Sequence, residues 1–147
     1  MKIFGSAWRR LEYMPTVPGP EAVALDRATV GAPRTFFDCV LVHIVAEDDD
    51  RRLAAAAARR VRDLAGDTGY LLVTGSCAAP SDGTRFRDGF GLVAEIAERL
   101  EEHGEQVHLL PFGWMFEYEG EPLPVCWEEQ VSAGAGAFRR RTAEAVG

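Results

Sequence analysis

The sequence has no long hydrophobic run, although 47% of its 147 residues are hydrophobic. The longest apolar stretches, residues 39–45 and 70–73, are far shorter than the roughly 20 residues that a membrane-spanning helix needs. The first six residues carry one positive charge but neither the apolar region nor the cleavage site typical of a secretion signal. We therefore expect no membrane contact and a cytoplasmic location.

Cysteine is scarce, and its spacing fits no metal or disulfide pattern. Cys39, Cys77 and Cys126 are widely spaced, odd in number and outside any CxxC motif. This spacing favours neither a disulfide-stabilised fold nor a zinc site. We expect three free thiols, no bound metal and no cofactor.

Lysine is nearly absent, because Lys2 is the only one among the 16 basic residues, and 23 acidic residues give a net charge of −7. Such a chain is not drawn to nucleic acid by its total charge. Arginine grips phosphate with two parallel hydrogen bonds, so a few well-placed arginines can still bind one. The alternative is that the paired arginines lie on solvated helix faces.

Hydrophobic patterning predicts one α/β (α+β) domain, with a mixed β-sheet and two main helices. Residues 36–45 alternate with both faces apolar, which is typical of a strand inside a covered sheet. Apolar residues at helical spacing predict helices over residues 53–64 and 90–103, the second with Phe90 facing inward. Residues 48–50 are predicted to cap the first helix.

Shorter strands are predicted at residues 1–5, with residues 11–13 as an alternative extension of the first one, and at residues 70–74 and 106–110. Two segments are predicted to be loops: residues 15–20, whose three prolines oppose strand pairing, and residues 75–89. A C-terminal hairpin over residues 113–126 is predicted to turn at Glu119 and Gly120. Residues 1–130 then form the domain, and residues 131–147 form a tail that is partly helical or disordered.

One segment has a distinctive motif: Leu-Leu-Pro-Phe-Gly-Trp at residues 109–114, followed by Gly-Glu-Pro-Leu at residues 120–123. It resembles the N-terminal editing domain of archaeal-type threonyl-tRNA synthetases, and the similarity extends over most of residues 1–124. The resemblance implies the fold of D-aminoacyl-tRNA deacylases, usually as a homodimer. It also implies hydrolysis of the ester that joins a wrong amino acid to the terminal adenosine of a tRNA.

The ionisable residues of that family are replaced in this chain. The family has a His-Ser-Asp run, a loop histidine, a lysine after Pro-Phe-Gly and a glutamate after Pro-Leu. The matching positions here hold Ala7, Trp8, Arg9, Ala78, Phe116 and Val125. None of these can transfer protons in the same way. The chemistry then relies on backbone donors and the substrate's own hydroxyl, or the pocket has another role.

The resemblance and the glycine-rich turns together give a set of expected site residues. Cys77 and Gly113 are the expected catalytic positions, through backbone donors and, for Cys77, a thiol. The expected substrate pocket is lined by Gly75, Ser76, Phe112, Trp114 and Trp8. The expected tRNA-binding residues are Arg9, Arg10, Arg85 and Arg87. His43 and His108 are expected to be core histidines.

Two functions remain open on this basis. The first is a freestanding deacylase whose partner is the 3′ end of an aminoacyl-tRNA or a similar aminoacyl-nucleoside ligand. The second is a catalytically silent binding module of the same fold. A homodimer is expected, because a mixed sheet leaves an open edge and residues 113–126 are rich in aromatic side chains.

Overall fold

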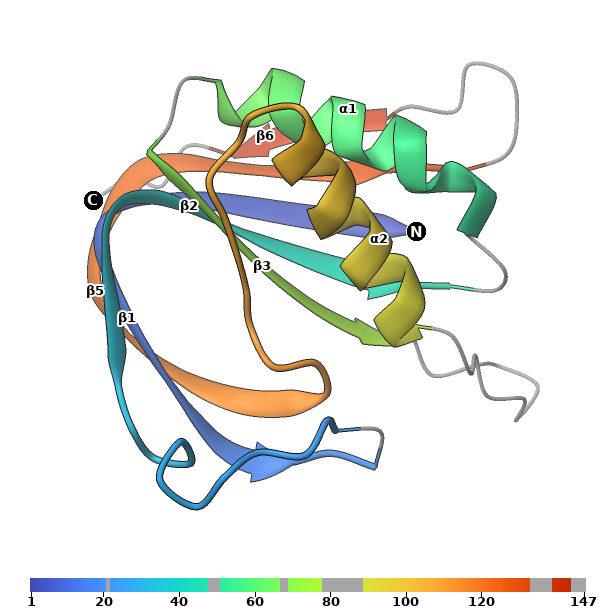
Figure 1. Ribbon diagram of the computed structural model, residues 1–147. Coiled ribbons are helices and arrows are strands. Elements are labelled where there is room, and N and C mark those ends of the chain that lie inside the picture. Colours follow the sequence, from blue (N-terminus) through green and yellow to red (C-terminus); the bar gives the residue numbers. More distant parts are fainter. Residues whose placement is uncertain (21, 48–50, 67–68, 78–88, 133–138, 144–147) are drawn as a thin grey trace.

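In the computed structural model the described residues are all except 21, 48–50, 67–68, 78–88, 133–138 and 144–147 (Figure 1). They form one α+β domain with a six-stranded mixed sheet in the order β4-β3-β2-β1-β5-β6 and two helices. The predicted fold class is confirmed. The strands are β1 (Lys2–Pro18), β2 (Arg34–Ala46), β3 (Tyr70–Cys77), β4 (Val107–Leu109), β5 (Trp114–Gln130) and β6 (Arg139–Ala143), and the helices are α1 (Ala54–Ala65), after a 3-10 turn at Arg51–Leu53, and α2 (Gly89–Glu102).

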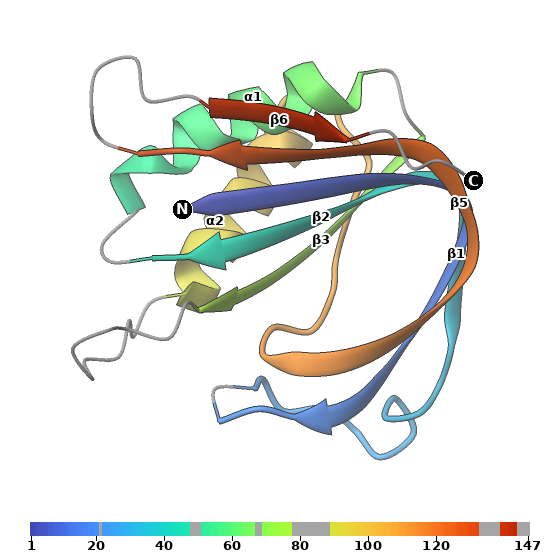
Figure 2. The same ribbon diagram turned by 180° about the vertical axis from the view of Figure 1, so that it is seen from behind.

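The sheet is strongly curved, because β1 and β5 bend together. The two 17-residue strands pair antiparallel, and their register shifts between Ser6 and Trp8, between Trp8 and Arg10, and between Pro15 and Val17. Such irregularities bend and twist a strand pair. The C-terminal part of β1 and the N-terminal part of β5, which pair with each other, therefore curl under the sheet on the side opposite the helices (Figures 1 and 2).

Two separate hydrophobic cores result from this curl. The helix-side core lies between the sheet and both helices and includes Val42, Val73 and Ile96. The concave cluster lies on the other face, where Trp8, Phe36, Leu41 and Phe116 pack against five buried residues, namely Leu11, Tyr13, Cys39, Leu72 and Leu110. Because β2 and β3 contribute to both cores, the prediction that this strand is covered on both faces is confirmed for residues 39–44. It is wrong for Phe37, which is 62% exposed next to Asp38, a residue with φ of 50°.

Both predicted helices are confirmed to within one or two residues at each end. Gly66, with φ of 64°, ends α1 by donating its N–H to the Arg62 carbonyl, and Gly104, with φ of 88°, follows α2. The expected inward position of Phe90 is wrong: this side chain is 47% exposed, and Leu92 is buried in its place. Leu53 is the cap residue of α1, without a side-chain capping hydrogen bond. The predicted capping residues 48–50 lie outside the described residues.

The proline-rich segment is part of a strand, contrary to prediction. Pro15 pairs with Phe116 and Pro18 pairs with Trp114 in the ladder of β1 with β5. The pairing of β1 with β2 ends at Tyr13, so both prolines lie where β1 has a single neighbouring strand. A missing N–H is tolerated at such an edge position.

The predicted C-terminal hairpin is also wrong, because β5 runs unbroken through Gly120. Glu119 and Gly120 pair with Glu12 and Leu11 of β1. A Cβ atom at Gly120 would overlap the carbonyl oxygen of Arg10, so glycine here permits a close approach of two strands.

Two further loop or tail predictions are corrected by strand pairing. Residues 75–77 extend β3, since Gly75, Ser76 and Cys77 pair with the end of β2. The tail contains β6, which pairs antiparallel with Cys126 to Gln130 of β5 and is not a helix.

A buried ion pair joins α1 to the sheet. Glu129 of β5 is fully buried, and its Oε1 accepts a hydrogen bond of 2.8 Å from the Arg60 guanidinium of α1. A buried carboxylate is strongly destabilising without such a partner. The pair therefore fixes the position of α1 over β5.

The close approach at Gly120 gives a stability test. We expect Gly120→Ala to lower the free energy of unfolding by about 3 kcal/mol, because the new methyl group meets rigid backbone. Gly31→Ala is the matched control: φ is 76° there but no atom lies within 4 Å, so only the conformational cost of about 1 kcal/mol applies. Urea unfolding of both variants checks the difference, and equal losses would contradict it.

Candidate functional site

Two of the predicted site residues, Cys77 and Phe112, come together beside the first residue of α2. A Cβ at Gly89 would overlap the Cys77 sulfur and lie 3.1 Å from Cζ of Phe112. Phe112 is buried in the helix-side core, and Cys77 packs against that core. Gly89 is therefore required by close packing, and Cys77 lies at the border between the core and the end of β3.

The turn from Phe112 to Trp114 is held by the segment that follows β1. The Gly19 N–H donates to the Gly113 carbonyl at 2.9 Å, and the Val23 N–H donates to the Phe112 carbonyl at 3.0 Å. The indole N–H of Trp114 donates to the Val23 carbonyl at 2.7 Å. These polar groups are satisfied within the protein, while Gly113 adopts a φ of 83° that favours glycine.

Trp8 lies apart from Phe112. It packs against the concave cluster, and its indole N–H donates to the Ser6 hydroxyl at 2.9 Å. Because Phe112 belongs to the helix-side core, the two aromatic side chains line different regions. Of the predicted tRNA-binding residues, Arg9 is exposed and Arg10 is half-buried on β1, whereas residues 85 and 87 lie outside the described residues.

Ser76, also a predicted pocket residue, is paired with a histidine. His43 Nε2 lies 2.9 Å from the Ser76 hydroxyl oxygen, across the parallel strands β2 and β3. The ring of Phe4 makes an edge contact with the His43 ring, with centroids 6.5 Å apart. Burial lowers the pKa of His43, so the imidazole is neutral at pH 7 and can accept a proton from the hydroxyl.

A second histidine is paired with a tyrosine inside the concave face. The Tyr13 hydroxyl lies 2.5 Å from Nε2 of His108, although the two residues are 95 positions apart. Phe36 lies 4.8 Å from the His108 ring and Phe116 lies 5.5 Å from the Tyr13 ring, centroid to centroid. The pair is thus enclosed by aromatic side chains.

The protonation of this pair follows from its surroundings. Burial, aided by the charge of Arg34, lowers the pKa of His108 to about 4, and burial raises the pKa of Tyr13. At pH 7 the tyrosine therefore keeps its proton and donates it to a neutral imidazole. Sequence patterning had assigned His108 to the core without a partner, because nothing local links β4 to β1.

Cys39 is a second buried thiol on this face. Burial first, and the negative charge of Asp38 second, raise its pKa to about 11. A thiol that stays protonated at pH 7 is a poor nucleophile. Cys39 therefore contributes to packing in the concave cluster.

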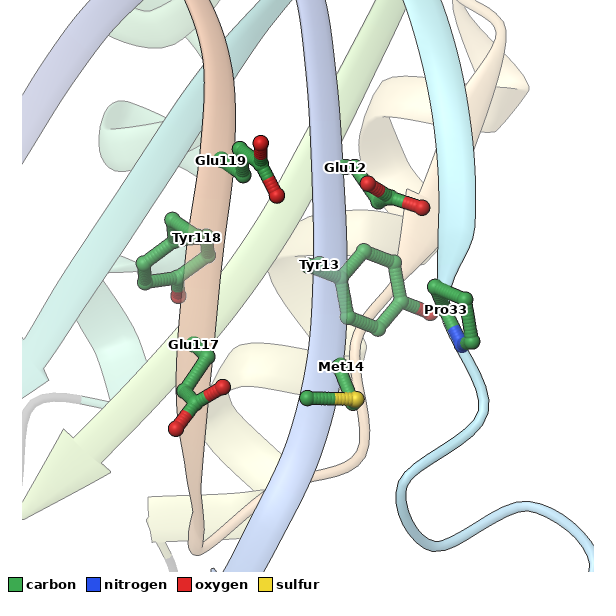
Figure 3. Close-up of a pocket in the computed structure, with 7 residues that line it drawn as sticks. All are labelled: Glu12, Tyr13, Met14, Pro33, Glu117, Tyr118 and Glu119. Atoms are coloured by element: carbon green, nitrogen blue, oxygen red, sulfur yellow. The ribbon is translucent and has the colours of Figure 1, made fainter.

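Two cavities meet at Tyr13, which lines both. The first, of about 440 Å³, is acidic: Glu12 and Glu119 occupy paired positions on β1 and β5, with Glu117 nearby (Figure 3). Its full lining is Glu12, Tyr13, Met14, Pro33, Glu117, Tyr118 and Glu119. The second, of about 400 Å³, has four polar or charged lining residues, Tyr13, Thr29, Arg34 and His108, on an otherwise apolar wall.

No protein-family model matches the chain, and a search of curated proteins gives no significant match. Within the described residues, no three or more His, Cys, Asp and Glu side chains gather in a way that could hold a metal ion. The described helices include none that is long and apolar enough to cross a membrane.

The depressed pKa of His108 predicts a pH-dependent stability. Between pH 6.5 and pH 4 the unfolded state binds a proton at this residue and the folded state does not, so stability is lost as the pH falls through that window. Urea unfolding at several pH values should give His108→Gln a weaker loss than the wild type. His103→Gln, at the exposed end of α2, is the control and should follow the wild type. An equal loss in His108→Gln and the wild type would contradict the assignment.

Proposed function

We propose that the chain is a freestanding aminoacyl-tRNA deacylase, with the fold of D-aminoacyl-tRNA deacylases, that hydrolyses the ester of a mischarged or unusual aminoacyl-tRNA. The resemblance of residues 109–123 to the synthetase editing domain supports this, as does an α+β domain with two helices on a mixed sheet. The observation that carries the proposal is the contact of 2.9 Å between His43 Nε2 and the Ser76 hydroxyl. It supplies proton-transfer chemistry in a chain that lacks the ionisable residues of the family.

In the proposed reaction, neutral His43 takes the proton of the Ser76 hydroxyl as its oxygen adds to the ester carbonyl. The tetrahedral oxyanion collapses, the bond to the ribose oxygen breaks, and His43 returns the proton to that oxygen. In the second step His43 takes a proton from a water molecule as it attacks the ester formed on Ser76. The amino acid is released, and the proton returns to the Ser76 oxygen. Ser76 takes the catalytic role expected for Cys77, since the Cys77 sulfur packs against Gly89 and the helix-side core.

Neighbouring side chains suit the ends of such a substrate. Phe4, 38% exposed and in contact with His43, offers a ring on which an adenine or an apolar side chain can pack. Arg9 is exposed on the same strand and, with Arg10, is proposed to contact tRNA phosphates.

Single-turnover deacylation of a panel of labelled aminoacyl-tRNAs, including seryl-tRNA and D-aminoacyl-tRNAs, tests this proposal. We expect Ser76→Ala and His43→Gln to slow the reaction about 100-fold or more, because each removes one member of the proton-transfer pair. Cys126→Ala on β5 is the control and should keep the wild-type rate. No wild-type rate above buffer on any substrate would eliminate the proposal.

A second candidate is a catalytically silent binding module, favoured by the replacement of the family's ionisable residues at Ala7, Phe116 and Val125. Such a module binds an aminoacyl-adenosine without turning it over. A non-hydrolysable aminoacyl-adenosine analogue should then raise the melting temperature equally in the wild type and in Ser76→Ala. Turnover that is lost in His43→Gln would exclude this alternative.

A homodimer is proposed along the outer edge of β5. In the described part of the chain, β6 pairs only from Cys126 onward, so residues 114–125 have β1 on one side and no strand on the other. This edge exposes Met115 (64%) and Val125 (54%). Apolar side chains at an open edge favour burial against a second copy.

Light scattering at micromolar concentration tests the dimer. We expect a mass near two chains for the wild type and near one chain for Met115→Glu, because the new carboxylate would be buried without a partner. Phe37→Glu is the control, since Phe37 is similarly exposed (62%) but lies on β2. A wild-type mass near one chain would defeat the proposal.

A further inference from the structure

We propose that the cavity between the curled end of β1, the segment 25–34 and β4 binds a small organic carboxylate with an apolar body. The cavity is about 400 Å³, within the range of small-molecule sites. Its lining includes neither Phe112 nor His43 or Ser76, so it is distinct from the pocket expected around Phe112 and from the proposed catalytic pair, and it requires nothing of the deacylase proposal.

The charge of the cavity favours an anion. Arg34 is the only ionised group among its lining residues, because none of them is acidic and His108 is neutral at pH 7. Among the described residues no carboxylate forms an ion pair with Arg34, whose guanidinium lies 5.8 Å from the Phe36 ring centroid. A planar guanidinium that no such carboxylate occupies can bind the carboxylate of a ligand through two parallel hydrogen bonds.

The remaining wall selects the body of the ligand. It is built from six apolar residues, namely Pro15, Leu25, Ala28, Ala32, Leu109 and Pro111. An aliphatic or aromatic group gains by leaving water for such a wall. An α-ammonium group would lose its hydration there without meeting a carboxylate, so the acid without an amino group is the preferred form.

Tyr13 and His108, which are hydrogen-bonded to each other, both line the cavity. The Tyr13 hydroxyl proton is already donated to His108, so this pair adds no second positive charge. The single positive charge of Arg34 then balances the single negative charge of the ligand carboxylate. A dianionic phosphate would exceed that balance, which separates the proposed carboxylate from a phosphate ligand.

Titration calorimetry of the full chain with hexanoate and 3-phenylpropionate tests the site. Hexanamide, phenylalanine and hexyl phosphate are the comparison ligands. We expect a carboxylate of the panel to bind at millimolar concentration or below, with hexanamide, phenylalanine and hexyl phosphate each at least tenfold weaker.

Variants locate the binding. Arg34→Gln should weaken carboxylate binding at least tenfold, and Ala28→Phe should do the same by filling the cavity without changing its charge. Arg27→Gln, an exposed arginine next to Ala28 that does not line the cavity, is the matched control and should bind as the wild type does. Circular dichroism confirms that each variant is folded.

Several results would overturn the proposal: no heat of binding with either acid, equal binding of hexanamide, unchanged binding in Arg34→Gln, or tighter binding of hexyl phosphate or phenylalanine. Because none of these ligands is an ester and Ser76 is unchanged in every variant, failure here leaves the deacylation result independent.

Discussion

The antiparallel ladder of β1 with β5 is the constraint on which the rest of the molecule depends. Tyr13 of β1 and His108 of β4 belong to strands separated in the sheet by β2 and β3. In a flat sheet three strand spacings would keep their backbones roughly 14 Å apart. The curl of β1, bent at its register shifts, brings the Tyr13 hydroxyl to 2.5 Å from Nε2 of His108. Without this curl the concave cluster would be an exposed apolar face.

The sequence was sufficient wherever local patterning decides the structure. The alternation of residues 39–44 and the helical spacing of the segment that forms α2 each depend on a single element burying its own faces, and both are confirmed. Phe37 and Phe90, near the starts of these two elements, are exposed, contrary to prediction. The conformation at Gly120 could not be predicted from local sequence. A glycine after Glu119 suits a tight turn and a close strand approach equally well, and the 14-position pairing of β5 with β1 decides between them.

In the candidate site, too, some features follow from local sequence and others from strand pairing. Cys77 and Phe112, both expected in the site, do lie near one another, at the end of β3 and beside Gly89. Trp8 could not be assigned to a face, because the register shifts on either side of it change which way the strand presents its residues. The partners of His43 and His108 depend on strand register and on the curl, neither of which leaves a local pattern in the sequence.

The two histidines are both neutral at pH 7 through burial, yet their partners give them different chemistry. The partner of His43 is a serine hydroxyl at the end of β3, a group that can lose its proton as it forms a covalent bond. The partner of His108 is a tyrosine enclosed by aromatic rings, whose raised pKa makes proton loss unfavourable. Proton transfer is therefore favoured at His43 and a fixed hydrogen bond at His108. Because Phe4 and Tyr13 are both on β1, one curved strand connects the region suited to reaction with the region suited to recognition.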